Sequence, residues 1–331
     1  MQSNVNYLKQ NDISNVPIFP KRLLLGINDG QCNMKCPFCY VHGDGAKNTK
    51  QLIGDMPYDL ACKIFDEVQG TGIFISPVLW SEPLLVQNLE NYVSYMSGKG
   101  LNVFINSNGL LLTEEKVTAL FSAKVHTLFI SIDAITNETL KTIRGIKKLQ
   151  EIHDSVFRLL KIRGDNRTPR IGVSFNESEV NMHEKDKFIS FWLKHVDVVR
   201  VNKIYEKKLN YIKNLQIRTK RIPCGALYDT MAINHKGNVP ICCLDSHNQT
   251  NMGNVFQDSV EGVWNGEKFQ EVRFYHESDQ YDKISLCKNC DVWLNYLIEE
   301  REVDGIFIRQ SPIMTYYNRI DRLYSWHSRI R

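Results

Sequence analysis

The stretch Cys32-Asn33-Met34-Lys35-Cys36-Pro37-Phe38-Cys39-Tyr40 places three thiols within eight residues. Three residues separate the first pair of cysteines and two separate the second, and no fourth cysteine adjoins them. Thiolates are soft ligands that favour iron–sulfur centres, so this loop can hold three corners of a cubane cluster. The fourth iron would have no protein ligand and would stay open to a small molecule. A zinc knuckle and incidental core cysteines are the alternatives.

Apolar segments of strand and helix type alternate around this loop. Residues 22–27 (RLLLGI) lead directly into it and have the continuous apolar character of a strand buried on both faces. Further strands are expected at 72–78, 101–106, 126–132, 170–175 and 197–202, and helices at 58–68, 89–96, 113–121, 151–162 and 185–194. This alternation predicts parallel β/α units that close into a partial (β/α)6 barrel of the α/β class. Active sites of such barrels lie where the strands end, which is where the thiol loop begins.

Composition narrows the class of protein. The chain has 331 residues, of which 43% are hydrophobic and 24% charged, and this supports a real core. A net charge of +4 is too small to favour nucleic acid as a partner. No apolar run reaches the roughly 18 residues that span a bilayer, and the polar N-terminus lacks the core of a signal peptide. Nine cysteines in such a chain indicate metal or redox sites, so we expect a cytoplasmic protein working at low oxygen.

Residues 203–221 interrupt the alternation with seven basic residues and one acid. Such a run is typical of a solvated linker. The functional alternative is a patch that receives an anionic substrate, for example a sugar phosphate, a nucleotide sugar or an acidic peptide.

A second group of cysteines occupies the C-terminal part of the chain: Cys224, Cys242-Cys243 and Cys287-Lys288-Asn289-Cys290. Between them, residues 231–234 and 238–241 flank a glycine turn and predict a β-hairpin. Residues 258–264 and 267–274 are expected to be helical. The tail from residue 291 is expected to begin as a helix and then become an aromatic, basic arm packed on the barrel.

The first motif, with Phe38 just before its last cysteine, resembles the radical S-adenosylmethionine (SAM) enzymes. The resemblance implies that Cys32, Cys36 and Cys39 hold a 4Fe–4S cluster whose open iron binds SAM. An electron from the cluster then splits the sulfonium, and a 5′-deoxyadenosyl radical takes a hydrogen atom from the substrate. An external electron donor such as flavodoxin or ferredoxin is implied as a partner.

Later motifs follow the family in order along successive strand ends. They are Trp80-Ser81-Glu82-Pro83, in which Trp80 and Ser81 replace two glycines of the family, Asn106-Ser107-Asn108-Gly109, Ser131-Ile132-Asp133 and Ile143-Arg144-Gly145. The resemblance implies that the arginine lies near the SAM carboxylate, a charge-assisted pairing. The SAM-binding residues expected from it are Tyr40, Ser81, Glu82, Asn106, Asn108, Ser131, Asp133 and Arg144.

The C-terminal cysteines resemble the SPASM/twitch branch of this family. The matching run is Gly237–Cys243, followed by Met252–Val255, Val263–Asn265 and the CxxC at 287–290. The resemblance implies one auxiliary 4Fe–4S cluster, with Cys224, Cys242, Cys287 and Cys290 each ligating an iron. A structural zinc site suits four cysteines too and stays as the alternative. The expected domains are an N-terminal arm (1–21), the barrel (22–205), the auxiliary-cluster domain (206–291) and the tail (292–331).

Cys243 and Asp245 are candidate catalytic residues. If Cys242 is the cluster ligand, Cys243 is a free thiol beside the cluster, and its weak S–H bond could quench a substrate radical from the opposite face, which inverts a carbon centre. Asp245 could act as the base in a dehydrogenation, with the electron passing to the auxiliary cluster. A buried spare thiol and a loop-organising carboxylate are the plainer interpretations.

Two reactions therefore stay open, with epimerisation slightly favoured over dehydrogenation. The resemblance implies a sugar or aminocyclitol substrate, phosphorylated or nucleotide-linked forms included, or a peptide. The short polar N-terminus lacks the leader-binding domain of many peptide-modifying members and lowers the peptide alternative. More remote are a zinc-ribbon module that binds nucleic acid and a maturation factor with a degenerate radical site.

Overall fold

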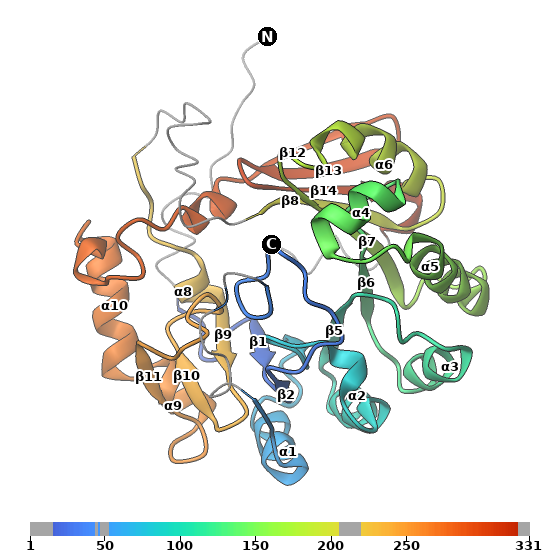
Figure 1. Cartoon of the computed structure of the whole chain (residues 1–331). Helices are drawn as coiled ribbons and strands as arrows, with labels where there is room; N and C mark the ends of the chain where they lie inside the picture. The colour runs from blue at the N-terminus through green and yellow to red at the C-terminus, as the bar shows by residue number, and fades with distance from the viewer. Residues whose placement is uncertain (1–15, 44–45, 47–52, 205–219, 324–331) are drawn as a thin grey trace.

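Six parallel strands form the curved sheet at the centre of the computed structural model, which describes residues 16–43, 46, 53–204 and 220–323. Along the sheet they are β1 (Arg22–Leu25), β4 (Phe74–Ser76), β5 (Asn102–Ser107), β6 (Thr127–Ser131), β7 (Arg170–Glu177) and β8 (Val198–Lys203). Every neighbouring pair in this series is parallel. The predicted partial (β/α)6 barrel is therefore confirmed, with its helices on the outer face of the sheet (Figure 1).

The predicted helices are present as α1 (Tyr58–Glu67), α2 (Leu89–Gly98), α3 (Glu114–Ser122), α5 (Leu149–Arg163) and α6 (Lys185–Trp192). The side chain of Thr113 caps α3 by accepting a hydrogen bond from the amide of Lys116 at 3.2 Å, which explains where that helix begins. One helix was not predicted, α4 (Asn137–Arg144), whose eight residues give too short a periodic pattern. The Glu184 carboxylate stabilises its start by accepting hydrogen bonds from the Ile135 amide and from the hydroxyls of Thr136 and Thr139.

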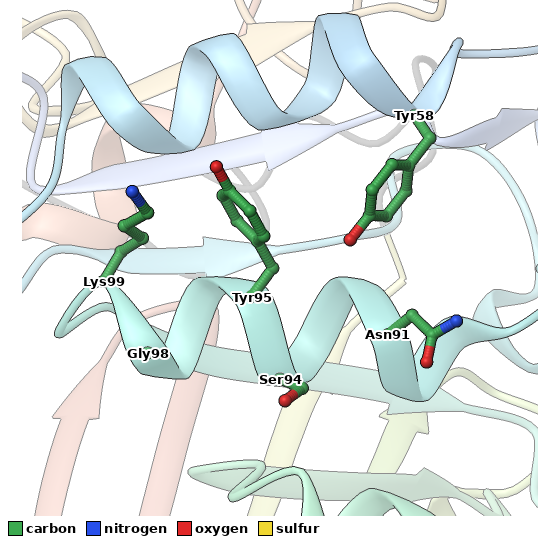
Figure 2. Close-up of a pocket in the computed structure, with 6 residues that line it drawn as sticks. All are labelled: Tyr58, Asn91, Ser94, Tyr95, Gly98 and Lys99. Carbon is green, nitrogen blue, oxygen red and sulfur yellow. The ribbon is translucent and has the colours of Figure 1, made fainter.

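Helices α1 and α2 lie side by side on the outer face and leave a depression of about 530 Å³ between them (Figure 2). Tyr95 on α2 and Lys99 just after its end line the depression. The Tyr95 hydroxyl donates a hydrogen bond to Asp66 on α1 at 3.0 Å, and the Lys99 ammonium forms an ion pair with Asp66 at 2.6 Å. None of the residues lining this depression belongs to a predicted site.

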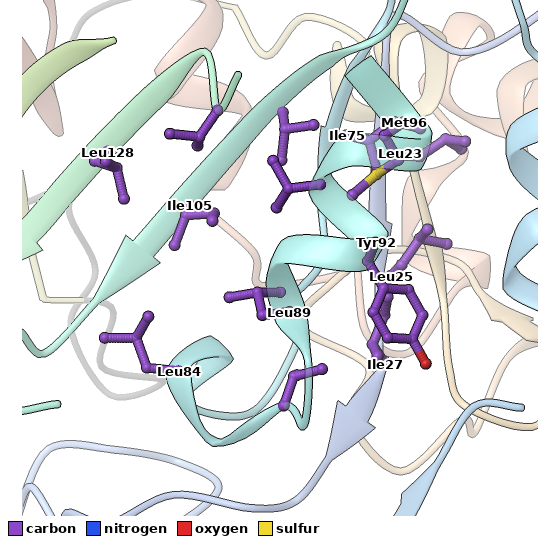
Figure 3. Close-up of a cluster of buried hydrophobic side chains, with 14 of the residues drawn as sticks. Leu23, Leu25, Ile27, Ile75, Leu84, Leu89, Tyr92, Met96, Ile105 and Leu128 are labelled. Atoms are coloured by element: carbon purple, nitrogen blue, oxygen red, sulfur yellow. The ribbon is translucent and has the colours of Figure 1, made fainter. Parts of the chain in front are cut away.

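The main core lies between the sheet and these helices. Side chains alternate along each strand, so Leu23, Leu25, Ile75, Ile105 and Leu128 point outward and are almost fully buried. They pack beneath α2 together with Leu89, Tyr92 and Met96 (Figure 3). The intervening residues of each strand face the interior of the barrel, and this is where polar side chains accumulate.

The C-terminal cysteine region begins with α8 (Ala226–Asp229) and β9 (Thr230–Ile233). Strand β9 pairs in parallel with β1 and so extends the barrel sheet. The predicted hairpin is wrong in its pairing: β10 (Asn238–Pro240) instead pairs antiparallel with β11 (Asn251–Asn254). The turn itself exists, with Gly237 at φ 77°, but β1 offers β9 a free edge that the local sequence cannot reveal. Helices α9 (Val260–Trp264) and α10 (Glu267–Glu277) agree with prediction.

The tail differs from the expected helix. A short 3-10 turn, η6 (Val292–Tyr296), leads into β12 (Glu299–Val303), β13 (Ile306–Ser311) and β14 (Met314–Arg319), which are mutually antiparallel. β14 pairs antiparallel with β8 and continues the sheet beyond the barrel. Asp304 and Gly305 form the two-residue turn between β12 and β13, at φ 49° and 76°, and Asp-Gly is a sequence typical of tight hairpin turns.

Short elements complete the described chain. These are strands β2 (Asn28–Asp29) and β3 (Gly54–Asp55), which pair with each other, and the 3-10 turns η3 (Pro83–Leu85), η4 (Met182–Glu184), η5 (Tyr281–Lys283) and η7 (Ile320–Arg322). No helix in these parts of the chain is both long and apolar enough to cross a membrane. Most of the basic stretch 203–221 and the tail beyond residue 323 lie outside the described residues, so the anionic-substrate patch expected there stays untested.

Candidate functional site

The three N-terminal thiols lie in one loop at the carboxyl end of β1. Backbone amides donate to two of the sulfurs, Met34 to Cys32 at 3.4 Å and His42 to Cys39 at 3.3 Å. Burial raises the pKa of Cys32 to about 11, and Cys36 and Cys39 are close enough to contribute. Partly buried thiols that accept hydrogen bonds from backbone amides fit a cluster whose irons supply positive charge.

A glycine closes this loop. The Gly43 amide donates to the carbonyl of Cys39 at 2.8 Å. A Cβ at position 43 would come within 2.6 Å of the carbonyl oxygens of Cys36, Pro37 and Cys39. The loop can therefore wrap tightly around its three thiols only with glycine at this position.

A buried ion pair connects the loop to the next strand ends. The guanidinium of Arg144 binds the Asp133 carboxylate at 2.6 Å, and its Nη1 lies 3.9 Å from the sulfur of Cys36. Although burial alone would lower it, the pKa of Arg144 is raised by Asp133 and Cys36. The other Asp133 oxygen accepts from Asn176, whose own side-chain oxygen accepts from Asn202 at 3.2 Å. A continuous polar network thus runs from the barrel wall to the first cluster loop.

Glu82 occupies the centre of a second network. Its carboxylate is buried and accepts hydrogen bonds from Ser107 at 2.7 Å, from the Asn108 amide at 2.9 Å and from the Leu84 amide at 3.1 Å. The Asn108 side chain reaches Asn33 in the thiol loop at 2.7 Å. Glu82 therefore joins the ends of β4 and β5, and its carboxylate is already engaged within the chain. Burial raises the pKa of Glu82, and these hydrogen bonds oppose the rise.

The remaining predicted SAM-binding residues also lie at strand ends or on the barrel interior. The Ser81 hydroxyl donates to Asn28 at 2.7 Å. Ser131 lies 3.3 Å from the hydroxyl of Ser174 on the neighbouring strand. Asn106 accepts a hydrogen bond from Arg200 at 3.1 Å. The structure thus brings the predicted residues to one end of the sheet around the thiol loop, and their roles toward SAM stay predictions.

The second thiol group gathers Cys224, Cys242, Cys287 and Cys290. Burial raises the pKa of Cys287 to about 12, with Cys290 adding to the rise. Burial also raises the pKa of Cys224, to which Cys290 and Cys287 contribute. No group of three or more His, Cys, Asp or Glu residues in the described chain is arranged to hold a single metal ion. A cubane carries its ligands on four separate irons, which spaces the sulfurs more widely.

The two thiol regions meet at Cys243. Its carbonyl oxygen accepts a hydrogen bond from the indole of Trp80 at 2.8 Å and another from the hydroxyl of Tyr40 at 3.1 Å. Tyr40 is a predicted SAM-binding residue, and Trp80 directly precedes another, Ser81. Burial raises the pKa of the Cys243 thiol, and the guanidinium of Arg22, on β1, opposes the rise. Cys243 therefore bridges the auxiliary region and the barrel.

Asp245 lies in the same loop as Cys243, and its carboxylate points toward the backbone of that loop. Its two oxygens accept hydrogen bonds from the Gln249 amide at 2.8 Å and from the Thr250 amide at 2.9 Å and hydroxyl at 2.5 Å. The residue is buried. This geometry organises the turn that follows Cys243 and leaves the carboxylate little freedom to take a proton from a substrate.

Sequence reasoning missed the polar wall inside the barrel. Arg200 on β8 and Tyr316 on β14 are opposite each other in register and point inward. A single arginine inside the apolar segment 197–202 was a usable signal, since a charged residue within a buried strand needs a partner or a cavity. The contribution of β14 could not be found in this way, because its pairing with β8 joins distant parts of the chain.

Family models match both regions. The model described as "Radical SAM superfamily" covers residues 30–187, and "Iron-sulfur cluster-binding domain" (SPASM) covers residues 224–291. The matched residues include all seven cysteines that form the two groups. The two models therefore divide the chain as the cysteine groups do.

Relatives span several chemistries. "S-adenosyl-L-methionine-dependent 2-deoxy-scyllo-inosamine dehydrogenase" from Niallia circulans is 22% identical, over 80% of this chain and 90% of that protein. "AdoMet-dependent heme synthase" from Methanosarcina barkeri is 35% identical, but over only 35% of this chain and 32% of that protein. The chain thus spans about a third of the length of that second relative.

Solved structures share the fold. SuiB from Streptococcus suis bound to S-adenosylmethionine aligns with a TM-score of 0.61 and 16% identity, over 87% of this chain and 74% of SuiB. BtrN in complex with AdoMet and 2-DOIA aligns with a TM-score of 0.53 and 19% identity, over 82% of this chain and 92% of BtrN. At these identities the likeness establishes architecture alone.

Proposed function

Because the chain belongs to the radical SAM superfamily and carries a SPASM iron–sulfur domain, we propose that it inverts a C–H centre of its substrate with Cys243 as the hydrogen-atom donor. The family implies one 4Fe–4S cluster that binds SAM and an auxiliary iron–sulfur cluster. The first cluster and SAM together supply the group that removes a hydrogen atom from the substrate. The chain's own residues decide what happens afterwards.

The position of Cys243 carries this proposal. Trp80 and Tyr40 hold its carbonyl beside the predicted SAM site, and burial raises the pKa of its thiol while Arg22, on β1 of the barrel sheet, lies close enough to oppose the rise. Burial and the neighbouring Cys243 raise the pKa of Cys242, and Cys224 and Cys290 also contribute, which supports Cys242 as the auxiliary-cluster ligand of the pair. A thiol beside the barrel can deliver a hydrogen atom to a substrate radical from the face opposite the abstraction.

The atoms balance as follows. One substrate C–H bond breaks and its hydrogen atom leaves with the SAM-derived fragment; the Cys243 S–H bond breaks and a new C–H bond forms on the other face. The thiyl radical left on Cys243 regains an electron and a proton to restore the thiol. An external low-potential donor such as flavodoxin or ferredoxin would supply that electron and the one used to cleave SAM. Cys224, Cys242, Cys287 and Cys290 would hold the auxiliary cluster, which would provide a relay for electrons.

Dehydrogenation of a carbinol is the second candidate. It is favoured by the 2-deoxy-scyllo-inosamine dehydrogenase, which matches 80% of this chain. In that reaction the substrate radical loses an electron to the auxiliary cluster and a proton to a base. Hydrogen bonds within its own loop engage the carboxylate of Asp245, the residue expected to be this base, and this argues against that role. The substrate in either case is a sugar, an aminocyclitol or a peptide.

The test compares the wild-type protein with Cys243→Ala, anaerobically in deuterated water, with candidate aminocyclitols, sugars and peptides. The wild type should place solvent deuterium at the inverted carbon, while the variant should still cleave SAM but leave the centre uninverted. Cys62→Ala, which removes a thiol from α1, is the matched control and should behave as the wild type. A ketone product that persists in Cys243→Ala would replace epimerisation with dehydrogenation.

A further inference from the structure

One row of side chains crosses the inner wall of the barrel (Figure 1 shows strands β6, β7, β8 and β14 in sequence). Ser131 pairs in register with Ser174, Ser174 with Arg200, and Arg200 with Tyr316. Residues in register on adjacent strands point to the same face of a sheet. Arg200 therefore has hydroxyl-bearing neighbours on both sides.

Two contacts hold the guanidinium of Arg200 in place. Its Nη2 donates to the side-chain oxygen of Asn106 at 3.1 Å, and its Cζ atom lies 4.7 Å from the centre of the Phe129 ring. Its Nε is buried and has no hydrogen-bond partner. No carboxylate pairs with Arg200 within the part of the chain that the structure describes.

Three other arginines around the barrel have carboxylate partners. Arg22 pairs with Asp229 at 3.2 Å, and Arg309, next in the row beyond Tyr316, pairs with Glu300 at 2.8 Å. Arg144 pairs with Asp133. Arg200 is partly buried, and a partly desolvated guanidinium on the inner wall gains from an anion beside it, so its position favours a ligand that provides one.

The depth of Arg200 points to the substrate as that ligand. Asn202, two residues further along β8, belongs to the polar network that leads to Arg144 and Cys36. Two residues of a strand span ~7 Å, so Arg200 lies one layer deeper in the barrel than the residues around the first cluster loop. A molecule that binds below that loop would reach Arg200 with the end remote from the cluster.

We propose that Arg200 binds an anionic group of the substrate, a carboxylate or a phosphate, inside the barrel; this rests on the proposed function. Asn106 and Phe129 fix the plane of the guanidinium and leave its Nη end for the anion. A planar fork of donors matches carboxylate and phosphate oxygens in pairs, which a lysine cannot do. The hydroxyls in the same row provide further polar groups around the anion.

The test measures binding of inorganic phosphate and of acetate to the anaerobically reconstituted protein with SAM present, by titration calorimetry. Arg200→Gln should weaken the preferred anion at least tenfold. Arg301→Gln removes the same charge from the exposed strand β12 and should bind as the wild type does. Tighter phosphate binding would assign a phosphorylated substrate, and tighter acetate binding a carboxylate.

Cleavage of SAM to deoxyadenosine under dithionite is measured on the same samples. Its absence from the wild type would end the proposed function, whereas unchanged anion binding in Arg200→Gln, with cleavage intact, would overturn only the role of Arg200. A wild type that binds neither anion would overturn it too. If Arg200→Gln fails to retain iron, Arg200→Lys gives the answer: it keeps the charge but lacks the fork, and binding equal to that of the wild type would refute the proposed geometry.

Discussion

Replacing Asp133 with asparagine tests the ion pair that joins the barrel to the first thiol loop. Asp133 is fully buried, and its carboxylate accepts hydrogen bonds from the Nε and Nη2 of Arg144 at 2.7 and 2.6 Å. Its backbone lies at φ 70°, a conformation that asparagine tolerates nearly as well. Asparagine also retains an acceptor for the amide of Asn176, so the substitution removes chiefly the negative charge.

The expected loss is about 3–5 kcal/mol of unfolding free energy, because the guanidinium of Arg144 stays buried without its partner. Adding Arg144→Met removes the stranded charge, so the double variant should lose about 1–3 kcal/mol less than the two single losses combined. Asp321→Asn breaks a more exposed pair with Arg319 and should cost about 1 kcal/mol or less.

Urea unfolding of the anaerobically reconstituted proteins, followed by circular dichroism and by the visible absorbance of the clusters, measures these losses. Absorbance should disappear at lower urea in Asp133→Asn than in the control, since Arg144 also lies against Cys36. Equal losses in Asp133→Asn and Asp321→Asn, or strict additivity with Arg144→Met, would refute the reasoning.

Three further predictions concern other parts of the molecule. Cys224→Ala should lower the iron content after reconstitution from about eight to about four atoms per chain, while Cys62→Ala stays near eight. Colorimetric analysis measures the iron, and equal iron contents in the two variants would contradict this prediction. Trp80→Phe keeps an aromatic ring but removes the donor to the Cys243 carbonyl, so a chelator should extract auxiliary-cluster iron several-fold faster, and an unchanged rate would argue against the contact. Although burial alone would raise it, the pKa of Glu184 is lowered by hydrogen bonds around the start of α4. The ionised carboxylate therefore stabilises the fold at pH values above its unfolded pKa. This contribution is lost as the pH falls through the folded pKa. The stability deficit of Glu184→Gln, measured by urea unfolding of the metal-free reduced chain, should therefore be larger at pH 7 than near pH 4, and a deficit independent of pH would refute the assignment.

Local patterns predicted much of the barrel. The continuous apolar run at 22–27 became β1, and the spacing of Ile152, Val156 and Leu159 marked the buried face of α5. Such patterns succeed because burial of one face imposes a period on the sequence wherever the element is long enough. Helix α4 was missed since eight residues show little more than two turns.

Pairings between distant segments were not predictable in the same way. Strand β9 joins β1 and strand β14 joins β8, although about 200 and 115 residues, respectively, separate the partners along the chain. Each pairing satisfies the backbone groups of an open barrel edge, and that edge exists only once the six parallel strands have assembled. The hairpin expected around Gly237 was wrong in its pairing because β10 pairs with β11, a strand that follows later in the chain.

By itself, the sequence determined the candidate ligands and the chemistry they suit: three thiols in one short loop, and a second set closed by a CxxC. Chemical identity and spacing within a loop are local properties that no distant contact alters. Tertiary structure decided what those ligands face. It placed the Cys243 carbonyl between Trp80 and Tyr40, engaged Asp245 within its own loop, and left the guanidinium of Arg200 without a carboxylate on the inner wall. Which polar groups stay available to a substrate depends on partners brought together from distant strands, and only the folded chain fixes them.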